Sequence, residues 1–238
     1  TLRVTDPKPE GFLLGRVGKS GKILENQQRG FEPDTWPLLP SKTLHLDLTQ
    51  TKEELRKNLD PDARYSIRKA KEKLIIDRSQ SSPENLWKFG QILKKTGKQK
   101  GFYTPKWKDL KNKVECFGEK AWLILAMSRK DKEKPIAGCL LLIHNRIAYY
   151  HHAASSKEGR NLLAGYLVLW EAIKLAKEQG CHTFDFEGIF DPRFPKLTKG
   201  WKGFTYFKKK FGGSELEFPR PIIKYYSRPF ELLTKLFG

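Results

Sequence analysis

The sequence is poor in cysteine and in long apolar segments, and each shortage excludes a class of protein. Its 238 residues include three cysteines that lie far apart, Cys116, Cys139 and Cys181. They form neither a disulfide framework nor a Cys-x-x-Cys metal motif, so a reducing compartment is expected. No apolar run approaches the roughly 20 residues that span a bilayer, and the first residues do not resemble a signal peptide. We therefore expect a cytoplasmic protein.

Acidic residues are also scarce relative to basic ones. The chain has 46 Lys and Arg against 27 Asp and Glu, which gives a formal net charge of +19. Such an excess favours a polyanionic partner, such as nucleic acid, a phosphorylated metabolite or the inner face of the plasma membrane, although a lysine-rich proteome would also produce it. The aromatic share of 12% is too large for a disordered chain, so the protein is expected to fold.

The hydrophobic pattern predicts a helical first part followed by a sheet. Apolar and polar residues alternate in Leu44–Leu48, as in a strand, and signals for helix starts follow at Thr51, Asp60, Ser82 and Thr104. The later part is expected to contain strands at 121–128, 136–143, 147–155 and 183–187 and helices at 164–179 and 201–211. This order predicts a mixed α/β sheet with helices on its faces, and a boundary between residues 1–117 and 118–238.

The second expected helix carries a basic face. At about 100° per residue, Arg64, Arg68 and Lys71 fall on one side of it. Cations stacked in this way would bind phosphates through charge and through guanidinium hydrogen bonds. An ordinary solvated helix face is the alternative interpretation.

Two adjacent histidines occur in one of the expected strands. Successive strand residues point to opposite faces, so His151 and His152 cannot bind one metal, and no zinc site is expected. One of them could line a pocket, and a structural role is the alternative. The loop that follows leads into the helix at Ala164, whose first amides would attract an anion. Arg160 is a candidate phosphate clamp at this point, and Tyr166 lies in the first turn of the helix.

The expected strand 183–187 carries a carboxylate between two phenylalanines. Its period of two places Phe184 and Phe186 on one face and Asp185 on the other. A carboxylate on a central strand could act as a base or pair with a cation, and we favour a buried pairing role for Asp185.

The expected helix 201–211 combines aromatic residues with three consecutive lysines. In a helical projection the aromatic residues form one stripe, made of Trp201, Phe204, Phe207 and Phe211. Lys208 lies about 60° from the centre of this stripe, whereas Lys209 and Lys210 point away from it. A lysine held beside apolar surface is poorly screened and can stabilise an oxyanion or a phosphate. Three solvated surface lysines are the alternative.

Together these segments resemble the Fem family of peptidoglycan-bridge aminoacyltransferases (FemA, FemB and FemX). The similarity runs in order over residues 40–230. It lies in the Arg-Tyr-x-Ile-Arg-Lys-Ala segment from Arg64, the Ala-Tyr-Tyr-His-His segment from Ala148, the Phe-Asp-Phe-x-Gly segment from Phe184, the Gly-Phe-x-x-Phe-Lys segment from Gly203 and the Arg-Pro pair at Arg220.

The resemblance implies a fold and a reaction. The fold is GNAT-like, carried twice by family members, with residues 118–238 as the carboxyl-terminal copy and residues 1–117 as a truncated first copy. In the reaction, a stem-peptide amine of a peptidoglycan precursor attacks the ester of an aminoacyl-tRNA, which builds the interpeptide bridge of the cell wall. Phe207 and Lys208 match the family's Phe-Lys pair, and Lys208 would stabilise the oxyanion.

The resemblance also implies binding residues and partners. Arg160 and Tyr166 would contact the precursor, and Arg64, Arg68 and Asp185 are further candidates for substrate binding. The acceptor would be a UDP-linked or lipid-linked muropeptide precursor, and aminoacyl-tRNA would be the co-substrate, with no other cofactor and no metal. A monomer is expected, and its charge is compatible with peripheral membrane contact.

Two other functions stay open at this point. One is an acyl-CoA-dependent GNAT N-acyltransferase, although Leu163 stands where the loop that binds the CoA pyrophosphate should have its first glycine. The other is a non-catalytic basic binder of nucleic acid, for which no RNA-recognition signature is present.

Overall fold

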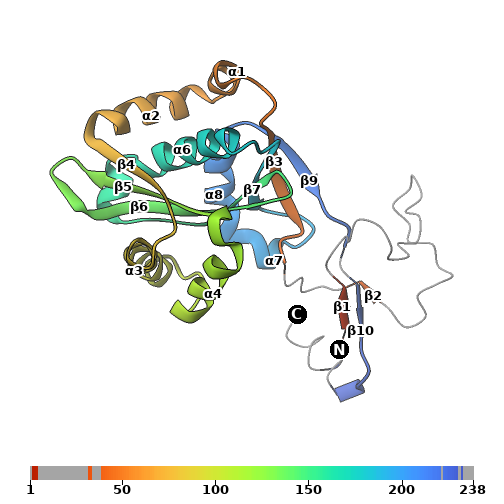
Figure 1. The fold of residues 1–238 in the computed structure, drawn as a ribbon. Helices are drawn as coiled ribbons and strands as arrows, with labels where there is room; N and C mark the ends of the chain where they lie inside the picture. Colours follow the sequence, from red (N-terminus) through yellow and green to blue (C-terminus); the bar gives the residue numbers. More distant parts are fainter. Residues whose placement is uncertain (1, 5–31, 34–38, 221, 230–231, 233–238) are drawn as a thin grey trace.

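The protein is built around one large sheet with helices on both faces. A computed structural model describes residues 2–4, 32–33, 39–220, 222–229 and 232. The large sheet has the strand order β4-β5-β6-β7-β8-β3-β9 (Figure 1). Its strands are β3 (Lys42–Asp47), β4 (Leu74–Gln80), β5 (Ala121–Ser128), β6 (Asp131–His144), β7 (Ile147–Ser155), β8 (Thr183–Gly188) and β9 (Ser214–Glu217). A small second sheet contains β1 (Leu2–Val4), β10 (Ile222–Lys224) and β2 (Glu32–Pro33). The predicted mixed α/β sheet is confirmed.

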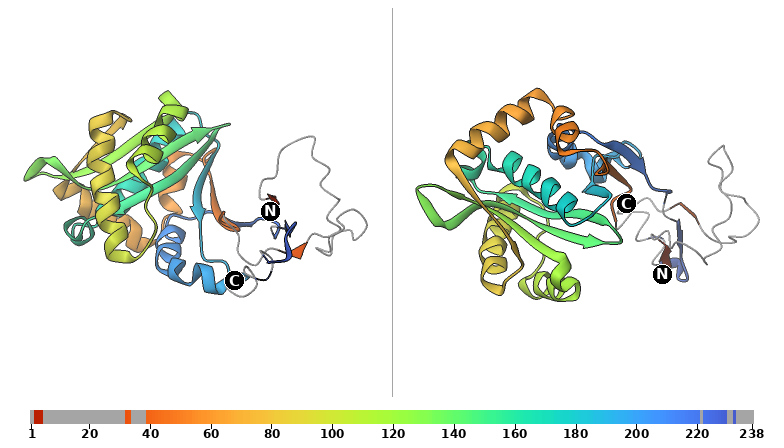
Figure 2. Two further views of the ribbon diagram at one scale, coloured as in Figure 1. Left: turned by 90° about the horizontal axis from the view of Figure 1, so that it is seen from below. Right: turned by 45° about the horizontal axis from the view of Figure 1, so that its top comes forward.

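The helices divide between the two faces of the large sheet. They are α1 (Lys52–Lys57), α2 (Pro61–Lys73), α3 (Pro83–Lys100), α4 (Trp107–Phe117), α5 (Lys157–Asn161), α6 (Ala164–Glu178), α7 (Pro195–Thr198) and α8 (Lys202–Lys209). Helices α2 and α6 pack together on one face, whereas α3 and α4 cover the other (Figure 2). Within the described residues, no helix combines the length and the apolar composition needed to cross a bilayer.

Most helix starts lie where the sequence predicts them. Helix α1 begins with a complete capping box, in which Thr51 and Glu54 satisfy each other's backbone amides. The helix expected from Thr104 instead begins at Trp107, because its N-cap residue Lys106 is still extended. The polar turn expected at 130–134 is also shorter than predicted. Strand β6 already begins at Asp131, since its exposed polar residues can project into water from the end of a long hairpin.

The centre of the sheet holds a parallel pair of strands that separates. Strands β7 and β8 are joined through α6 and pair in parallel, with Ile147 opposite Thr183 and Tyr149 opposite Asp185. The pairing stops there, although β7 continues to Ser155 and β8 to Gly188. Beyond this point the backbone groups of β7 and β8 no longer hydrogen-bond to each other. Backbone groups and side chains in this gap are therefore available to bind other groups.

The sheet does not divide at the predicted boundary. Strands β3 and β4 come from before residue 118, yet β3 lies between β8 and β9, and β4 lies beside β5. The segments on the two sides of residue 118 therefore share one sheet. Their assignment to a truncated first copy and a second copy stays a prediction.

Two apolar cores flank the sheet. The larger one lies under α2 and α6 and contains the predicted inward pair Phe184 and Phe186, both fully buried. The smaller one lies under α3 and α4 around Phe89. Because both faces of the central strands are buried, their sequences are almost continuously apolar, as Leu140–Ile143 illustrates.

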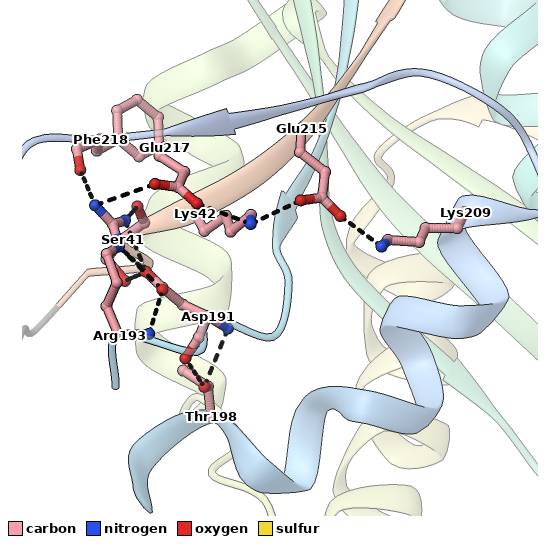
Figure 3. A network of polar contacts seen from close by, with 9 residues as sticks. All are labelled: Ser41, Lys42, Asp191, Arg193, Thr198, Lys209, Glu215, Glu217 and Phe218. Atoms are coloured by element: carbon pink, nitrogen blue, oxygen red, sulfur yellow. Dashed lines mark hydrogen bonds and ion pairs between the residues drawn. The ribbon is translucent and has the colours of Figure 1, made fainter. Parts of the chain in front are cut away.

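A polar network holds the segment that leads into α8 (Figure 3). The fully buried Asp191 accepts hydrogen bonds from Ser41 at 2.5 Å and from Arg193 at 2.7 Å, and its backbone carbonyl accepts one from Thr198. Burial by itself would raise the pKa of Asp191, but Arg193 and Ser41 outweigh it and bring the pKa to about 2. The amide of Phe190 donates to Thr205 of α8 at 2.8 Å. These bonds fix α8 against the end of β8.

The turn after α8 depends on glycine. Gly213 has a φ of +99°, and a Cβ at this position would lie 2.7 Å from the carbonyl oxygen of His45 on β3. The same turn lets the chain enter β9, which pairs with β3. A side chain at Gly213 would therefore strain the backbone and push β9 away from the sheet.

We expect Gly213→Ala to destabilise the fold by about 2 kcal/mol or more, because it adds both backbone strain and a clash. Gly203→Ala within α8 is the matched control. Its added methyl group would meet nothing within 4 Å, and we expect it to stabilise by about 0.5–1 kcal/mol. Urea unfolding followed by circular dichroism measures both variants. Equal stability of Gly213→Ala and wild type would contradict the close approach.

Candidate active site

The lysine singled out by the helical projection is buried at the end of β8. Lys208 is 8% exposed, and its Nζ donates a hydrogen bond to the carbonyl oxygen of Gly188 at 2.8 Å. The same ammonium lies over the ring of Phe204 at 4.7 Å from the centroid. A carbonyl dipole and an aromatic face therefore replace most of its water. The prediction that one lysine of this helix lies against apolar surface is confirmed for Lys208.

The environment of Lys208 changes its basicity. Burial lowers its pKa to about 8, and the charges of Glu187 and Asp185 partly oppose this shift. Below that pH the side chain is a desolvated cation, and above it the side chain becomes neutral. A cation with a pKa so close to neutrality, beside a gap in a sheet, is typical of a functional group more than of a structural one.

The other two lysines of the run have fixed partners. Lys209 pairs with Glu215 of β9 at 2.5 Å. Lys210 is also buried, and it bridges Asp60 at 3.2 Å and Asp62 at 2.6 Å at the start of α2, which raises its pKa. The alternative interpretation, three solvated surface lysines, is therefore wrong for Lys210. The chain leaves α8 at this residue, so the projection of a continuous helix no longer applies.

Aromatic rings connect α8 to the first turn of α6. Phe207 packs edge-on against Tyr166, with centroids 4.9 Å apart, and Phe211 stacks on the same tyrosine at 6.0 Å. The predicted site residues Phe207 and Tyr166 are thus in contact. With Phe211 they form an aromatic cluster that joins the end of α8 to the start of α6.

Asp185 has internal partners for its carboxylate. It accepts hydrogen bonds from the Thr43 hydroxyl and from the amide of Glu187 at 2.7 Å, and His45 Nε2 lies 3.3 Å away. Burial alone would raise the pKa of Asp185, but His45, Thr43 and the Glu187 amide outweigh it and lower the pKa. The pairing role that the sequence favoured is what this geometry displays. Asp185 thereby anchors the end of β8 to β3.

The two adjacent histidines do not point to opposite faces. A register shift between β6 and β7 bulges β7 at this point, and the rings of His151 and His152 lie 4.1 Å apart. The bulge cancels the alternation on which the prediction relied. His151 Nδ1 lies 2.6 Å from the carboxylate of Glu187, and its Nε2 lies 2.7 Å from the ammonium of Lys113 on α4. Sequence reasoning missed Glu187 and Lys113, because neither a bulge nor a contact with α4 leaves a local signal.

The basic face of α2 borders a hollow on the α2–α6 side of the sheet. This hollow has a volume of about 560 Å³ and is lined by Lys52, Glu53, Arg56, Leu59, Arg64, Ile67, Arg68, Lys71, Glu72, Trp170 and Lys174. We call it the basic groove. Six of its eleven lining residues are cationic and two are acidic, so it is suited to anions. The Arg64 guanidinium is partly occupied, because it donates to the carbonyls of Lys57 and Leu59.

Arg160 and Leu163 lie between β7 and α6. Arg160 is exposed and donates to the carbonyl of Ser155 at 2.6 Å, so its guanidinium is held at the end of β7. Leu163 is the N-cap of α6 and adopts a φ of +58°, a conformation that favours glycine. The backbone thus has the turn that a glycine would give, and the leucine side chain packs against the larger apolar core.

The fold and the comparison with a family model define the class of this protein. The chain belongs to the FemAB family, whose model matches residues 29–129 and 126–228. The crystal structure of FemX superposes with a TM-score of 0.71 at 20% identity, and the match covers 86% of this chain and 68% of that chain. The carboxyl-terminal domain of a putative lysylphosphatidylglycerol synthetase from Agrobacterium fabrum gives 0.58 at 14% identity, over 87% and 66% of the two chains. The GNAT-like fold expected from the resemblance is confirmed.

Two similar curated proteins come from Staphylococcus species. A lipid II:glycine glycyltransferase of Staphylococcus epidermidis is 28% identical over 137 residues, which are 53% of this chain and 32% of that protein. The protein of the same name from Staphylococcus aureus is 30% identical over 115 residues, which are 44% and 27% of the two chains. The matched part of the chain therefore spans about a third of the length of these relatives.

We expect the Lys208 ammonium to titrate near pH 8, because burial disfavours its charged form. NMR spectra of the protein with ¹³C-labelled lysine side chains, recorded across the alkaline range, measure this midpoint. The Lys208→Met variant identifies the resonance by its loss. A midpoint close to that of a free lysine would contradict the buried environment.

Proposed function

We propose that this protein is an aminoacyltransferase that moves an amino acid from aminoacyl-tRNA to a stem-peptide amine of a peptidoglycan precursor. The observation that carries the proposal is the buried Lys208 ammonium, which the resemblance matches to the family's Phe-Lys pair and which is held at the end of β8, beyond its pairing with β7. Membership of the family and the relatives called lipid II:glycine glycyltransferase support a wall precursor as the acceptor. The reaction needs no cofactor beyond the charged tRNA.

The proposed reaction develops negative charge at one atom. The acceptor amine attacks the ester carbonyl carbon, and the carbonyl oxygen becomes an oxyanion in the tetrahedral intermediate. The Lys208 ammonium is charged below pH 8 and poorly solvated, so it would stabilise this oxyanion strongly. The Gly188 carbonyl holds the cation in place before the reaction, which limits the reorganisation needed to reach the transition state. Phe207 and Tyr166 would keep water from the ester.

Both proposed substrates are anions. We infer that the phosphates of one of them lie in the basic groove, where Arg64, Arg68 and Lys71 of α2 are exposed and Arg64 is partly bound to backbone carbonyls. Arg160, held at the end of β7, would contact the precursor. The Asp185 carboxylate already contacts Thr43 and His45, so it would influence substrate binding by positioning these two side chains. A cytoplasmic monomer in peripheral contact with the membrane would meet a UDP-linked or a lipid-linked precursor.

Removal of the Lys208 charge tests the catalytic assignment. We expect Lys208→Met to lower kcat about 100- to 1000-fold, because the loss of one oxyanion-stabilising group has this effect, while the apolar chain still fills the site. Transfer of a radiolabelled amino acid from charged tRNA to a purified precursor measures kcat. Lys209→Met is the matched control, since the neighbouring lysine is exposed and pairs with Glu215. Full activity of Lys208→Met would refute the role of the ammonium.

The basic groove yields a second prediction. The double variant Arg68→Ala/Lys71→Ala should weaken tRNA binding and reduce the slope of the logarithm of the binding constant against log[salt] by about 1 to 2. The reason is that a protein with fewer phosphate contacts releases fewer counterions from the tRNA when it binds. Fluorescence anisotropy over a salt series measures the slope. Lys108→Ala/Lys111→Ala is the charge-matched control, as both lysines are exposed on α4, on the other face of the sheet. Equal slopes for the two double variants would exclude the groove as the tRNA site.

A further inference from the structure

A pair of side chains bridges β7 and β8 where their backbone pairing has ended. The last paired residues are Tyr149 and Asp185, and two residues further along, His151 Nδ1 contacts the Glu187 carboxylate at 2.6 Å. The side chains are 20% and 28% exposed, so the pair is held firmly and can still be reached from outside. The pair lies next to the lysine in the gap between the strands, because Gly188, the residue after Glu187, accepts the hydrogen bond from Lys208.

The contacts determine which ring nitrogen carries the proton. The Lys113 ammonium has only donors, so His151 Nε2 must accept from it at 2.7 Å. Nδ1 then carries the hydrogen and donates it to the Glu187 carboxylate. This is the arrangement of a general base: a carboxylate orients the imidazole, and the opposite nitrogen offers its lone pair. In this structure the Lys113 side chain, a primary ammonium, donates to the lone pair of Nε2. The proposed acceptor carries the same functional group.

Glu187 reaches His151 from an unusual backbone conformation. Its φ is +57°, in the left-handed region that glutamate rarely adopts. Asp185 helps to maintain it by accepting a hydrogen bond from the Glu187 amide, and the Thr43 hydroxyl, which donates to Asp185, lies 3.0 Å from the Glu187 carbonyl oxygen. Backbone strain of this kind is concentrated at functional sites, where the surroundings hold a side chain in position.

The neighbouring histidine does not have this arrangement. Burial, with smaller electrostatic contributions from the neighbouring His151 and Lys113, lowers the pKa of His152 to about 3. Its Nε2 is buried and has no hydrogen-bond partner among the described residues. The charged or titratable groups that contact the His151 ring are thus Lys113 from α4, Glu187 from β8 and His152 from β7.

We propose that His151 is the general base that deprotonates the acceptor amine, and that Glu187 is the residue that positions it. This inference rests on the proposed aminoacyl transfer. The acceptor ammonium displaces Lys113 from Nε2 and gives its first proton to His151, and Glu187 stabilises the imidazolium. The free amine then attacks the ester carbon, while Lys208 stabilises the oxyanion.

The proton balance of the transfer closes without another reactant. When the tetrahedral intermediate collapses, the bond between the carbonyl carbon and the ribose oxygen breaks. The nitrogen loses its second proton, which passes to the leaving ribose oxygen, and an amide remains. His151 returns the first proton to solvent, which restores the neutral imidazole for the next turnover.

The test compares two acceptors whose attacking nitrogens differ strongly in basicity. One is the stem-peptide precursor with its primary amine, and the other carries an aminooxy group in place of that amine. An alkylammonium is protonated at pH 7 and needs a base, whereas the much less basic aminooxy group is already neutral. We expect His151→Gln to lower kcat for the amine acceptor about 100-fold or more, as loss of a general base does, and to leave kcat for the aminooxy acceptor within a few-fold of wild type.

Further variants separate positioning from folding. Glu187→Gln should produce the same selective loss as His151→Gln, but a smaller one. His144→Gln, at an exposed position at the end of β6, is the matched control and should behave as wild type with both acceptors. Lys208→Met should impair both acceptors, since both reactions form the oxyanion.

Three outcomes would overturn the proposal, and they differ from one another. Full activity of His151→Gln with the amine would exclude the general base and leave the aminoacyl transfer intact. Equal loss with both acceptors would assign His151 a structural role. If wild type transfers to neither acceptor, the proposed function fails, and the general base fails with it.

Discussion

The hydrogen bond between the Lys208 ammonium and the Gly188 carbonyl is the interaction on which the site depends. A lysine in this position loses nearly all its water, and one carbonyl dipole and one aromatic face do not fully replace it, which is why its pKa falls to about 8. The cation is tolerated only because α8 is fixed. The Asp191 network holds the start of that helix, and the pairing of Lys210 with Asp60 and Asp62 holds its end.

The separation of β7 and β8 explains why the end of β8 can interact with α8 at all. In a fully paired sheet, strand β8 would have a neighbouring strand on both sides, and its carbonyls would be used in the two ladders. At Gly188 the β7 side is open, because β7 no longer pairs with β8 here. The bulge at His151 and the positive φ of Glu187 both occur in this unpaired stretch. The first lies at a register shift between β6 and β7 and the second beside a register shift between β3 and β8, and such shifts bend a strand and redirect its side chains.

The regular parts of the fold could be read from the sequence because their causes are local. Capping at Thr51, the shared face of Phe184 and Phe186, and the placement of Lys208 beside an aromatic ring of α8 each follow from spacing alone, and the structure confirms them. The bridging pair His151 and Glu187 could not be predicted, because it depends on a bulge and on a left-handed residue. These are set by the register between distant strands, which leaves no periodic signal in the sequence.

The contacts at the end of β8 keep the Glu187 carboxylate and the Lys208 ammonium from forming an ion pair with each other. Glu187 and Lys208 lie close enough for the carboxylate to raise the lysine pKa, and a direct ion pair between them would neutralise the ammonium. Instead the Glu187 carboxylate contacts His151, and the ammonium contacts a neutral carbonyl. The histidine therefore keeps the negative charge of Glu187 away from Lys208. The cation retains capacity to stabilise an oxyanion, because its closest partner is a dipole that a stronger acceptor can replace.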